Sequence, residues 1–274
     1  MVRWKFVHVA AVAAVLFAAT RIASALDYPS RPVHIIVGFP AASAPDIVTR
    51  LVAQRLSERL SLQFIVENRP GAGGSIGTQT VVNAAADGYT LLTATSANAI
   101  NATLYPNLNF NFIRDVAPVA FISHTPFVMV VNPPFPARTI PEFVAYAKAN
   151  PYRIHMASAG IGSTVHLCYE LFKMMTGLEL VHVPYRASFW ADLIGGQVQG
   201  AFGAITAALE YVRDGKLRAL AVTTARVDAL PDIPSMGEFV PGYEADGWFG
   251  IAAPKTTRAE VIGKLNEEIK IHRR

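Results

Sequence analysis

The chain has 274 residues, with 24 Lys and Arg against 20 Asp and Glu, and a formal net charge of +4 at pH 7. Three of the basic residues, Arg3, Lys5 and Arg21, lie in the first 25 positions. The remainder carries 21 basic against 20 acidic side chains, a balance that argues against nucleic-acid binding. The one cysteine, Cys168, excludes an intrachain disulfide.

The first 25 residues have the pattern of a secretory signal peptide. A basic start precedes an apolar run from Phe6 to Ala19, and the segment closes with Ala23-Ser24-Ala25. A retained membrane anchor is the alternative, but the run is short and Arg21 interrupts its end. We predict cleavage after Ala25. Export without disulfides indicates a bacterial periplasm.

Short apolar runs then alternate with segments of helical periodicity, which is typical of an α/β protein. Strands are predicted at 33–37, 63–67, 89–95, 116–122, 126–132, 153–157, 180–185, 198–204, 217–223 and 248–253. Helices are predicted at 44–60, 75–86, 139–148, 165–175, 207–213 and 257–269. Shorter helices are expected after residue 98 and around residues 192–194.

Loops with little charge, rich in Ser, Thr, Gly and Ala, follow several of these strands at 39–46, 96–98 and 158–164. In a parallel sheet such loops meet at the carboxyl edge, where α/β proteins bind ligands. Each one leads into a helix, whose first N–H groups and positive dipole end favour an anion such as a carboxylate or phosphate. The alternative is a set of ordinary strand–helix turns with nothing bound.

The sequence offers little support for catalysis. It has no G-x-S-x-G nucleophile elbow, no H-E-x-x-H metal helix and no histidine pair at metal-ligand spacing. The glycine run at 71–77 resembles a nucleotide loop, but the next strand ends in Thr95 rather than an acid. We therefore predict no enzyme, metal or cofactor. A Ser/His/Asp triad assembled in space, as in a secreted α/β hydrolase, stays an alternative.

Arg186 is the side chain most suited to an organic anion, because a guanidinium can bind a carboxylate through two parallel bonds. It equally suits a surface ion pair. Tyr185 could offer a hydroxyl to a ligand or fill space between lobes. Phe189 and Trp190 could form a wall of the cleft or belong to the core.

Several motifs together identify a family. They are YPSRPVHIIVGFPA (28–41), ENRPGAGGSIGT (67–78), DGYTLL (87–92), HVPYR (182–186) and GKLRALAVTT (215–224). With these motifs the chain resembles the Bug-type extracytoplasmic solute receptors, the binding-protein component of tripartite tricarboxylate transporters.

The resemblance implies a two-lobed periplasmic binding protein of the type II flytrap kind, each lobe a mostly parallel sheet flanked by helices. Lobe 1 would comprise residues 26–125 and 247–274, and lobe 2 residues 126–246. Such a receptor would be a monomer that captures a small organic carboxylate, or a related solute, between its lobes and delivers it to the permease subunits in the membrane.

Carried over position by position, the family pattern combines with the residue analysis to give the predicted ligand-binding residues. They are Phe39, Ala41, Ala42, Ser43, Asp46, Ser96, Asn98, Ser158, Gly160, Gly162, Ser163, Thr164, Tyr185, Arg186 and Gly203.

The chain also departs from the family pattern. Ala42 and Ser43 stand where relatives usually carry two glycines, and Gly203 stands where an acid commonly follows the strand Phe. The loss of that acid should favour ligands without an amino group there. The sequence also ends earlier than in typical members, so we expect a truncated lobe 1. A remnant that cannot bind is a further alternative.

Overall fold

The computed structural model describes residues 27–270. The predicted signal peptide and its cleavage site lie outside the described residues. Within them, no helix has the length and apolar character needed to cross a membrane.

One continuous sheet runs through residues 27–270, in the order β2-β1-β3-β9-β4-β7-β5-β6, with β8 paired to β4. The strands are β1 (Val33–Val37), β2 (Phe64–Asn68), β3 (Thr90–Thr95), β4 (Val116–Val131), β5 (His155–Ser158), β6 (Val181–Pro184), β7 (Gly200–Ala204), β8 (Arg218–Val222) and β9 (Asp246–Pro254). Strand β1 pairs in parallel with β2 and β3, and β5 pairs in parallel with β6 and β7. The pairs β3-β9, β4-β9, β4-β7 and β4-β8 are antiparallel.

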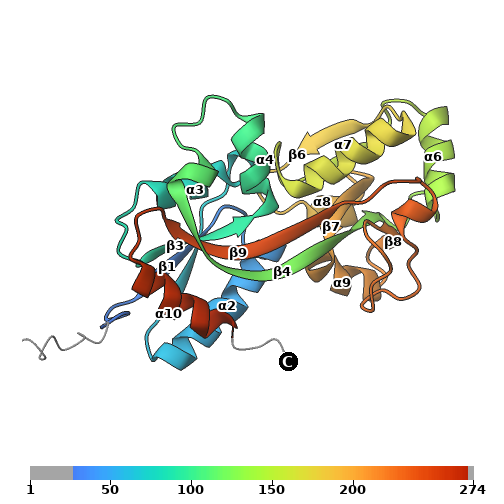
Figure 1. Cartoon of the computed structure of the whole chain (residues 1–274). Coiled ribbons are helices and arrows are strands. Elements are labelled where there is room, and N and C mark those ends of the chain that lie inside the picture. Colours follow the sequence, from blue (N-terminus) through green and yellow to red (C-terminus); the bar gives the residue numbers. More distant parts are fainter. Residues whose placement is uncertain (1–26, 271–274) are drawn as a thin grey trace, which may run out of the picture.

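The helices connect these strands. They are α2 (Ala44–Leu60), α3 (Ser75–Val82), α4 (Ser96–Leu104), α5 (Phe112–Asp115), α6 (Ile140–Ala149), α7 (Thr164–Thr176), α8 (Trp190–Ile194), α9 (Ile205–Arg213) and α10 (Ala259–Lys270), with 3₁₀ turns at Ala72–Gly74 and Met236–Glu238. Helix α3 ends at Val82, before the predicted end at residue 86. The parallel strands form two groups at the two ends of the molecule, and β4 and β9 run side by side from one group to the other (Figure 1). This is the two-lobed arrangement that the sequence predicted.

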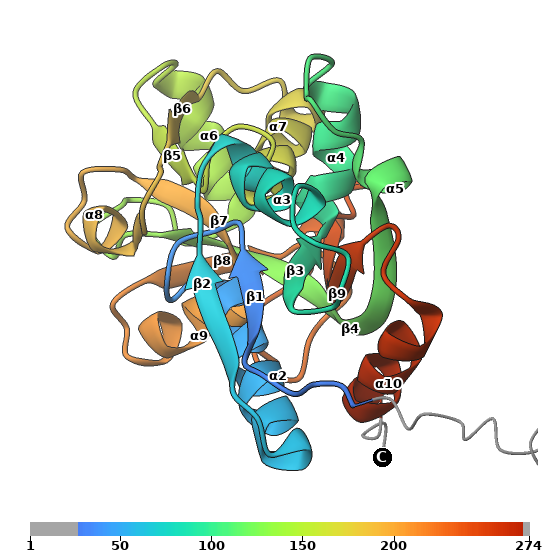
Figure 2. The same ribbon diagram turned by 90° about the vertical axis from the view of Figure 1, so that its left-hand side faces the viewer.

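In the first lobe, the strand residues alternate between two apolar layers. Ile35 and Leu91 pack with α2 and α10, while Ile36 and Leu92 pack with α3 on the other face. Figure 2 shows the sheet β2-β1-β3 with α3 on one side and α2 on the other. Because successive strand side chains point to opposite faces, a run such as VHIIV is buried on both sides.

The second lobe is built in the same way. Met129 on β4 packs toward the aromatic cluster of α6 and α7, which includes Phe143 and Phe172. Its neighbour Val130 packs toward α8 and α9 instead. Both lobes therefore have a core on each side of their strands, and the loops at the strand ends are left to form the site.

The prediction of two strands at 116–122 and 126–132 was wrong, because β4 is one strand of 16 residues. The intervening Ser123-His124-Thr125 has the polar character of a turn. However, β9 pairs along the whole segment, from Val116 opposite Pro254 to Pro126 opposite Asp246. Two shifts of register, near Ala120 and Ser123, accommodate the irregular sequence within the ladder.

The close β4-β9 pairing gives a stability prediction. A Cβ at Gly250 of β9 would lie 2.8 Å from the carbonyl oxygen of Ala120 on β4, so Gly250→Ala has to push the two strands apart. We expect it to lower the free energy of unfolding by about 1–3 kcal/mol, measured by urea denaturation. The control is Gly263→Ala in α10, where nothing lies within 4 Å of the new Cβ, and it should stabilise by about 0.5–1 kcal/mol. Equal effects of the two substitutions would contradict this account.

Candidate ligand-binding site

The loops at the carboxyl ends of β1, β3, β5 and β7 surround one cavity between the lobes, here called the main cavity. Each of these strands leads into a helix, namely α2, α4, α7 and α9. The first residues or the caps of all four helices line the cavity. Its lining is Phe39, Ser43, Ala44, Pro45, Thr95, Ser96, Phe127, Ala159, Ser163, Thr164, Val165, Phe189, Trp190, Gly203, Ala204, Ala207, Gly247 and Phe249.

Among residues 27–270, no Asp, Glu, Lys, Arg or His side chain belongs to this lining. The electrostatic character of the main cavity therefore comes from the backbone. Each of the four helix N-termini contributes the equivalent of about half a positive charge. Ser43 and Ala204, the N-caps of α2 and α9, make no side-chain bond to the first turn, so the N–H groups there are not capped. The arrangement suits an anion held by backbone amides.

The two lobes touch across the main cavity. Ser96, the first residue of α4, and Thr164, the first residue of α7, share a hydrogen bond of 2.7 Å between their hydroxyls. At the other end of α4, the Tyr105 hydroxyl donates to the carbonyl of Ile161 at 3.0 Å. The hydroxyls of Ser96 and Thr164 thus lie beside the first N–H groups of α4 and α7, where a bound anion could accept hydrogen bonds from them.

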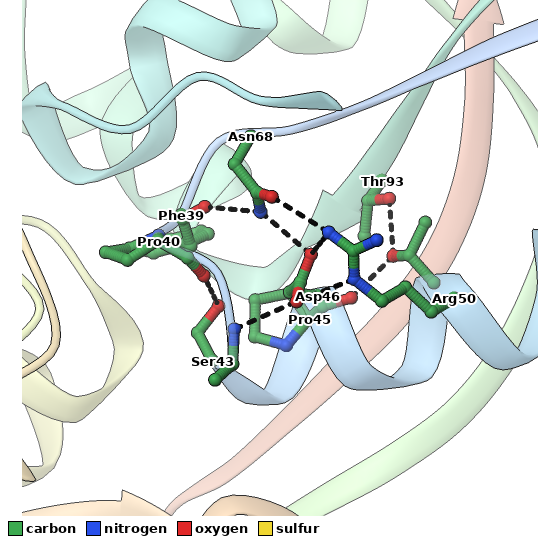
Figure 3. Close-up of polar contacts among 10 residues, drawn as sticks. Phe39, Pro40, Ser43, Pro45, Asp46, Arg50, Asn68 and Thr93 are labelled. Carbon is green, nitrogen blue, oxygen red and sulfur yellow. Dashed lines mark hydrogen bonds and ion pairs between the residues drawn. The ribbon is translucent and has the colours of Figure 1, made fainter. Parts of the chain in front are cut away.

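Asp46 does not line the main cavity but holds the loop that does. Its buried carboxylate accepts hydrogen bonds from the Ala42 N–H (2.9 Å), the Asn68 amide (2.9 Å) and Arg50 (3.0 Å), and Figure 3 shows it between Asn68 and Arg50. Burial alone would raise its pKa, but these hydrogen bonds outweigh burial and hold the pKa below its ordinary value. Ala42 has φ +61°, a left-handed conformation that is unfavourable for a residue with a Cβ. The glycine that the family pattern has at this position would adopt this conformation without that cost.

Other predicted residues also support the loops rather than the cavity surface. Asn98 accepts from the Thr95 N–H and donates to Thr78 at 2.7 Å, which fixes the start of α4. Ser158 is fully buried, accepts from the Gly160 N–H at 3.1 Å, and shares a hydrogen bond of 2.6 Å with His182.

Three further predicted residues stay off the main-cavity surface. Ala41 and Ala42 are exposed at the loop tip. Gly162 packs so closely on Asn101 that a Cβ would lie 2.1 Å from its amide oxygen.

A second space, here called the side cleft, contains the remaining predicted residues. Gly160, Tyr185 and Arg186 line it, and it shares Phe39 and Ala159 with the main cavity. The Tyr185 hydroxyl donates to Asp192 at 2.7 Å, and burial together with this neighbouring carboxylate raises the pKa of Tyr185 to about 12. The structure therefore brings Phe39, Ser43, Ser96, Ser163, Thr164 and Gly203 together in the main cavity and leaves Tyr185 and Arg186 beside it.

Several lining residues were not predicted. Thr95 directly precedes a predicted loop, so its position was within reach of the strand-end argument. Phe127 and Phe249 lie on β4 and β9, and only the pairing of these distant strands brings them to the cavity. Phe189 and Trp190, considered as wall or core from the sequence, do line it.

A family model described as the tripartite tricarboxylate transporter family receptor matches residues 48–273. The chain belongs to this family. Protein BugT of Bordetella pertussis is 38% identical over 252 residues, which span 90% of this chain and 77% of BugT.

Two solved structures have the same fold. Rpa4515 of R. palustris with adipate has a TM-score of 0.86 and 35% identity, covering 89% of this chain and 83% of that one. MatC (Rpa3494) from Rhodopseudomonas palustris with bound malate has a TM-score of 0.84 and 28% identity, covering 88% of this chain and 84% of that one. The prediction of a Bug-type periplasmic receptor with two lobes is confirmed.

The loop 158–164 rests on two stacked histidines, which gives a prediction about pH. The rings of His166 and His182 lie 4.3 Å apart, and burial, with smaller contributions from His166 and Lys173, lowers the pKa of His182 to about 4. Between pH 6.5 and about 4 the unfolded chain therefore binds more protons than the folded one. The part of the folding stability that depends on neutral His182 is present above this pH window and is lost as the pH falls through it.

His182→Gln should remove this part of the acid sensitivity. Between pH 7 and pH 4 the native receptor should lose up to about 3 kcal/mol more of its unfolding free energy than the variant, each measured against its own value at pH 7. Protonation of carboxylates such as Asp46 destabilises both proteins alike in acid. Urea denaturation at the two pH values therefore measures the contribution of the His182 imidazole alone. Parallel losses in the two proteins would refute this role of His182.

Proposed function

We propose that this receptor captures a small organic carboxylate in the main cavity and delivers it to the permease subunits of a tripartite transporter. The observation that carries the proposal is the convergence of four helix N-termini on a cavity that no charged side chain of residues 27–270 lines. The relatives Rpa4515, with adipate, and MatC, with malate, support the carboxylate class. In this proposal the backbone amides at the starts of α2, α4 and α7, where the hydroxyl side chains of the cavity also lie, hold the ligand carboxylate.

The lobes would close over the ligand by bending of the β4-β9 ladder. The sequence and its family resemblance predict lobe boundaries at 125/126 and 246/247. In the ladder Thr125 is paired with Gly247 and Pro126 with Asp246, so the two boundaries lie directly opposite each other. We place the hinge there. The hydroxyls of Ser96 and Thr164, one from each proposed lobe, would be within reach of each other only when the lobes are closed.

We infer a monomer without catalytic activity, exported by cleavage after Ala25. Within residues 27–270, the Ser–His hydrogen bond of Ser158 and His182 involves a fully buried hydroxyl, and His182 has no hydrogen bond to an acid there. This pair therefore lacks both the exposure and the orienting carboxylate that a hydrolase triad needs.

A thermal melt with a panel of mono-, di- and tricarboxylates and amino acids tests the ligand class. A ligand at a hundred times its dissociation constant should stabilise the receptor by about 2.7 kcal/mol and raise Tm by about 5–10 °C. Titration calorimetry then measures the affinity. Stabilisation by amino acids alone, with none by simple carboxylates, would count against the proposed class.

A matched pair of variants at Ser96 tests the site. Ser96→Asp places a negative charge beside the proposed carboxylate, whereas Ser96→Asn has the same shape without the charge. An acid in the first turn of α4 favours the helix, so folding should be preserved. We expect Ser96→Asp to weaken carboxylate binding at least about tenfold relative to Ser96→Asn. Equal affinities of the two variants would place the ligand charge elsewhere.

A further inference from the structure

The polar and aromatic groups of the main cavity are unevenly distributed. The hydroxyl side chains, Ser43, Thr95, Ser96, Ser163 and Thr164, are at the starts of α2, α4 and α7. One aromatic side chain, Phe39, lies in the loop before α2. The other four come from other elements, with Phe127 on β4, Phe249 on β9, and Phe189 and Trp190 at the start of α8. Gly247 marks the junction, because a Cβ there would lie 2.8 Å from Phe127 and 3.3 Å from the Ser96 hydroxyl.

Gly203 makes the aromatic wall possible. A Cβ at this position would lie 2.4 Å from the indole of Trp190, so the ring rests on the bare backbone of β7. Any side chain at residue 203, charged or not, would displace the indole. Trp190 also packs on Phe189, with ring centroids 4.6 Å apart, and on Tyr211 at 5.5 Å. The wall is thus a packed aromatic surface held in place from behind.

A second carboxylate would find no cationic side chain among the described residues of this wall. Arg186, the guanidinium that the sequence offered for a carboxylate, lines the side cleft and not the main cavity. A carboxylate buried against Phe127, Phe189 and Trp190 would lose hydration without gaining an ion pair, which is unfavourable. An apolar group in the same place would gain from leaving water.

We propose that this receptor selects a monocarboxylate with an apolar body over a dicarboxylate. The inference rests on the proposed function, because it assumes that one carboxylate binds at the helix N-termini. The body of the ligand then lies against Trp190, Phe189 and Phe127. Selectivity comes from the chemistry at the far end of the ligand, where a methyl or ring carbon is accepted and a charge is rejected.

Pairs of ligands with equal carbon number test this directly by calorimetry. Butyrate and succinate, hexanoate and adipate, and p-toluate and terephthalate each differ by the exchange of a terminal methyl for a carboxylate. The main cavity encloses about 80 Å³, so the pairs are graded in size from the smallest upward. We expect the monocarboxylate to bind at least about tenfold more tightly within each pair for which binding is measured.

A cation built into the wall should change this preference. Ala207, in the first turn of α9, lines the main cavity, and Ala207→Lys places an ammonium there. Relative to the native receptor, Ala207→Lys should change the ratio of dicarboxylate to monocarboxylate affinity by at least about tenfold in favour of the dicarboxylate. Ala207→Met, of similar length and without charge, should keep the monocarboxylate preference and shows that the effect is not one of size.

Three results would overturn the inference. The first is tighter binding of the dicarboxylates than of the monocarboxylates by the native receptor. If Arg186→Gln then abolished this dicarboxylate preference, the second carboxylate of the ligand would be assigned to the side cleft. The second is an identical ratio of dicarboxylate to monocarboxylate affinity in Ala207→Lys and Ala207→Met, which would mean that the wall takes no part in ligand selection. Binding of neither ligand class would overturn the proposed function itself, and the inference with it.

Discussion

The antiparallel pairing of β4 with β9 is the constraint on which the rest of the structure depends. β4 pairs with β9 in the first lobe and with β7 and β8 in the second, so it fixes how β1 and β3 at one end face β5 and β7 at the other (Figure 1). The carboxyl ends of four strands then open toward a common space, and the helix after each strand begins there. Without this ladder the same loops would belong to two separate sheets, and no cavity would have contributions from both.

Within that frame, the charge of the site is a property of the backbone. The buried carboxylate of Asp46 is already satisfied by Asn68, Arg50 and the Ala42 N–H, so it shapes the loop and does not repel a ligand anion from the cavity surface. The helix dipoles remain as the positive contribution. Each dipole is held firmly within its lobe, because its helix is packed on the core, and the amides need little reorientation when an anion binds.

Much of the fold could be predicted from sequence because its signals are local. The apolar run of β1, the proline near the start of α2 and the glycine-rich loop after β5 each indicate a strand, a helix start or a close backbone approach. These signals also located the loops of the site. The uninterrupted β4 could not be predicted, since His124 and its polar neighbours look like a turn until β9, far along the chain, is paired with them.

The roles of single side chains were harder to predict than their positions. Asp46 and Asn98 stand in the loops that the sequence identified, but their partners, Arg50, Asn68 and Thr78, decide that they brace the loops. Arg186 lies at the end of a predicted strand, yet the path of the chain after β6 carries it into the side cleft. Such outcomes depend on which elements become neighbours, and no local pattern encodes that.

The reliance on backbone amides also bears on how such a receptor can change over generations. A single codon change cannot remove an N–H group from a helix start unless it introduces proline, so the preference for an anion is insulated from most point mutations. The aromatic wall opposite is made of side chains, and a single substitution at Gly203 or Ala207 would change the surface that the ligand contacts there. The fold therefore keeps one half of its specificity constant while the other half is free to vary.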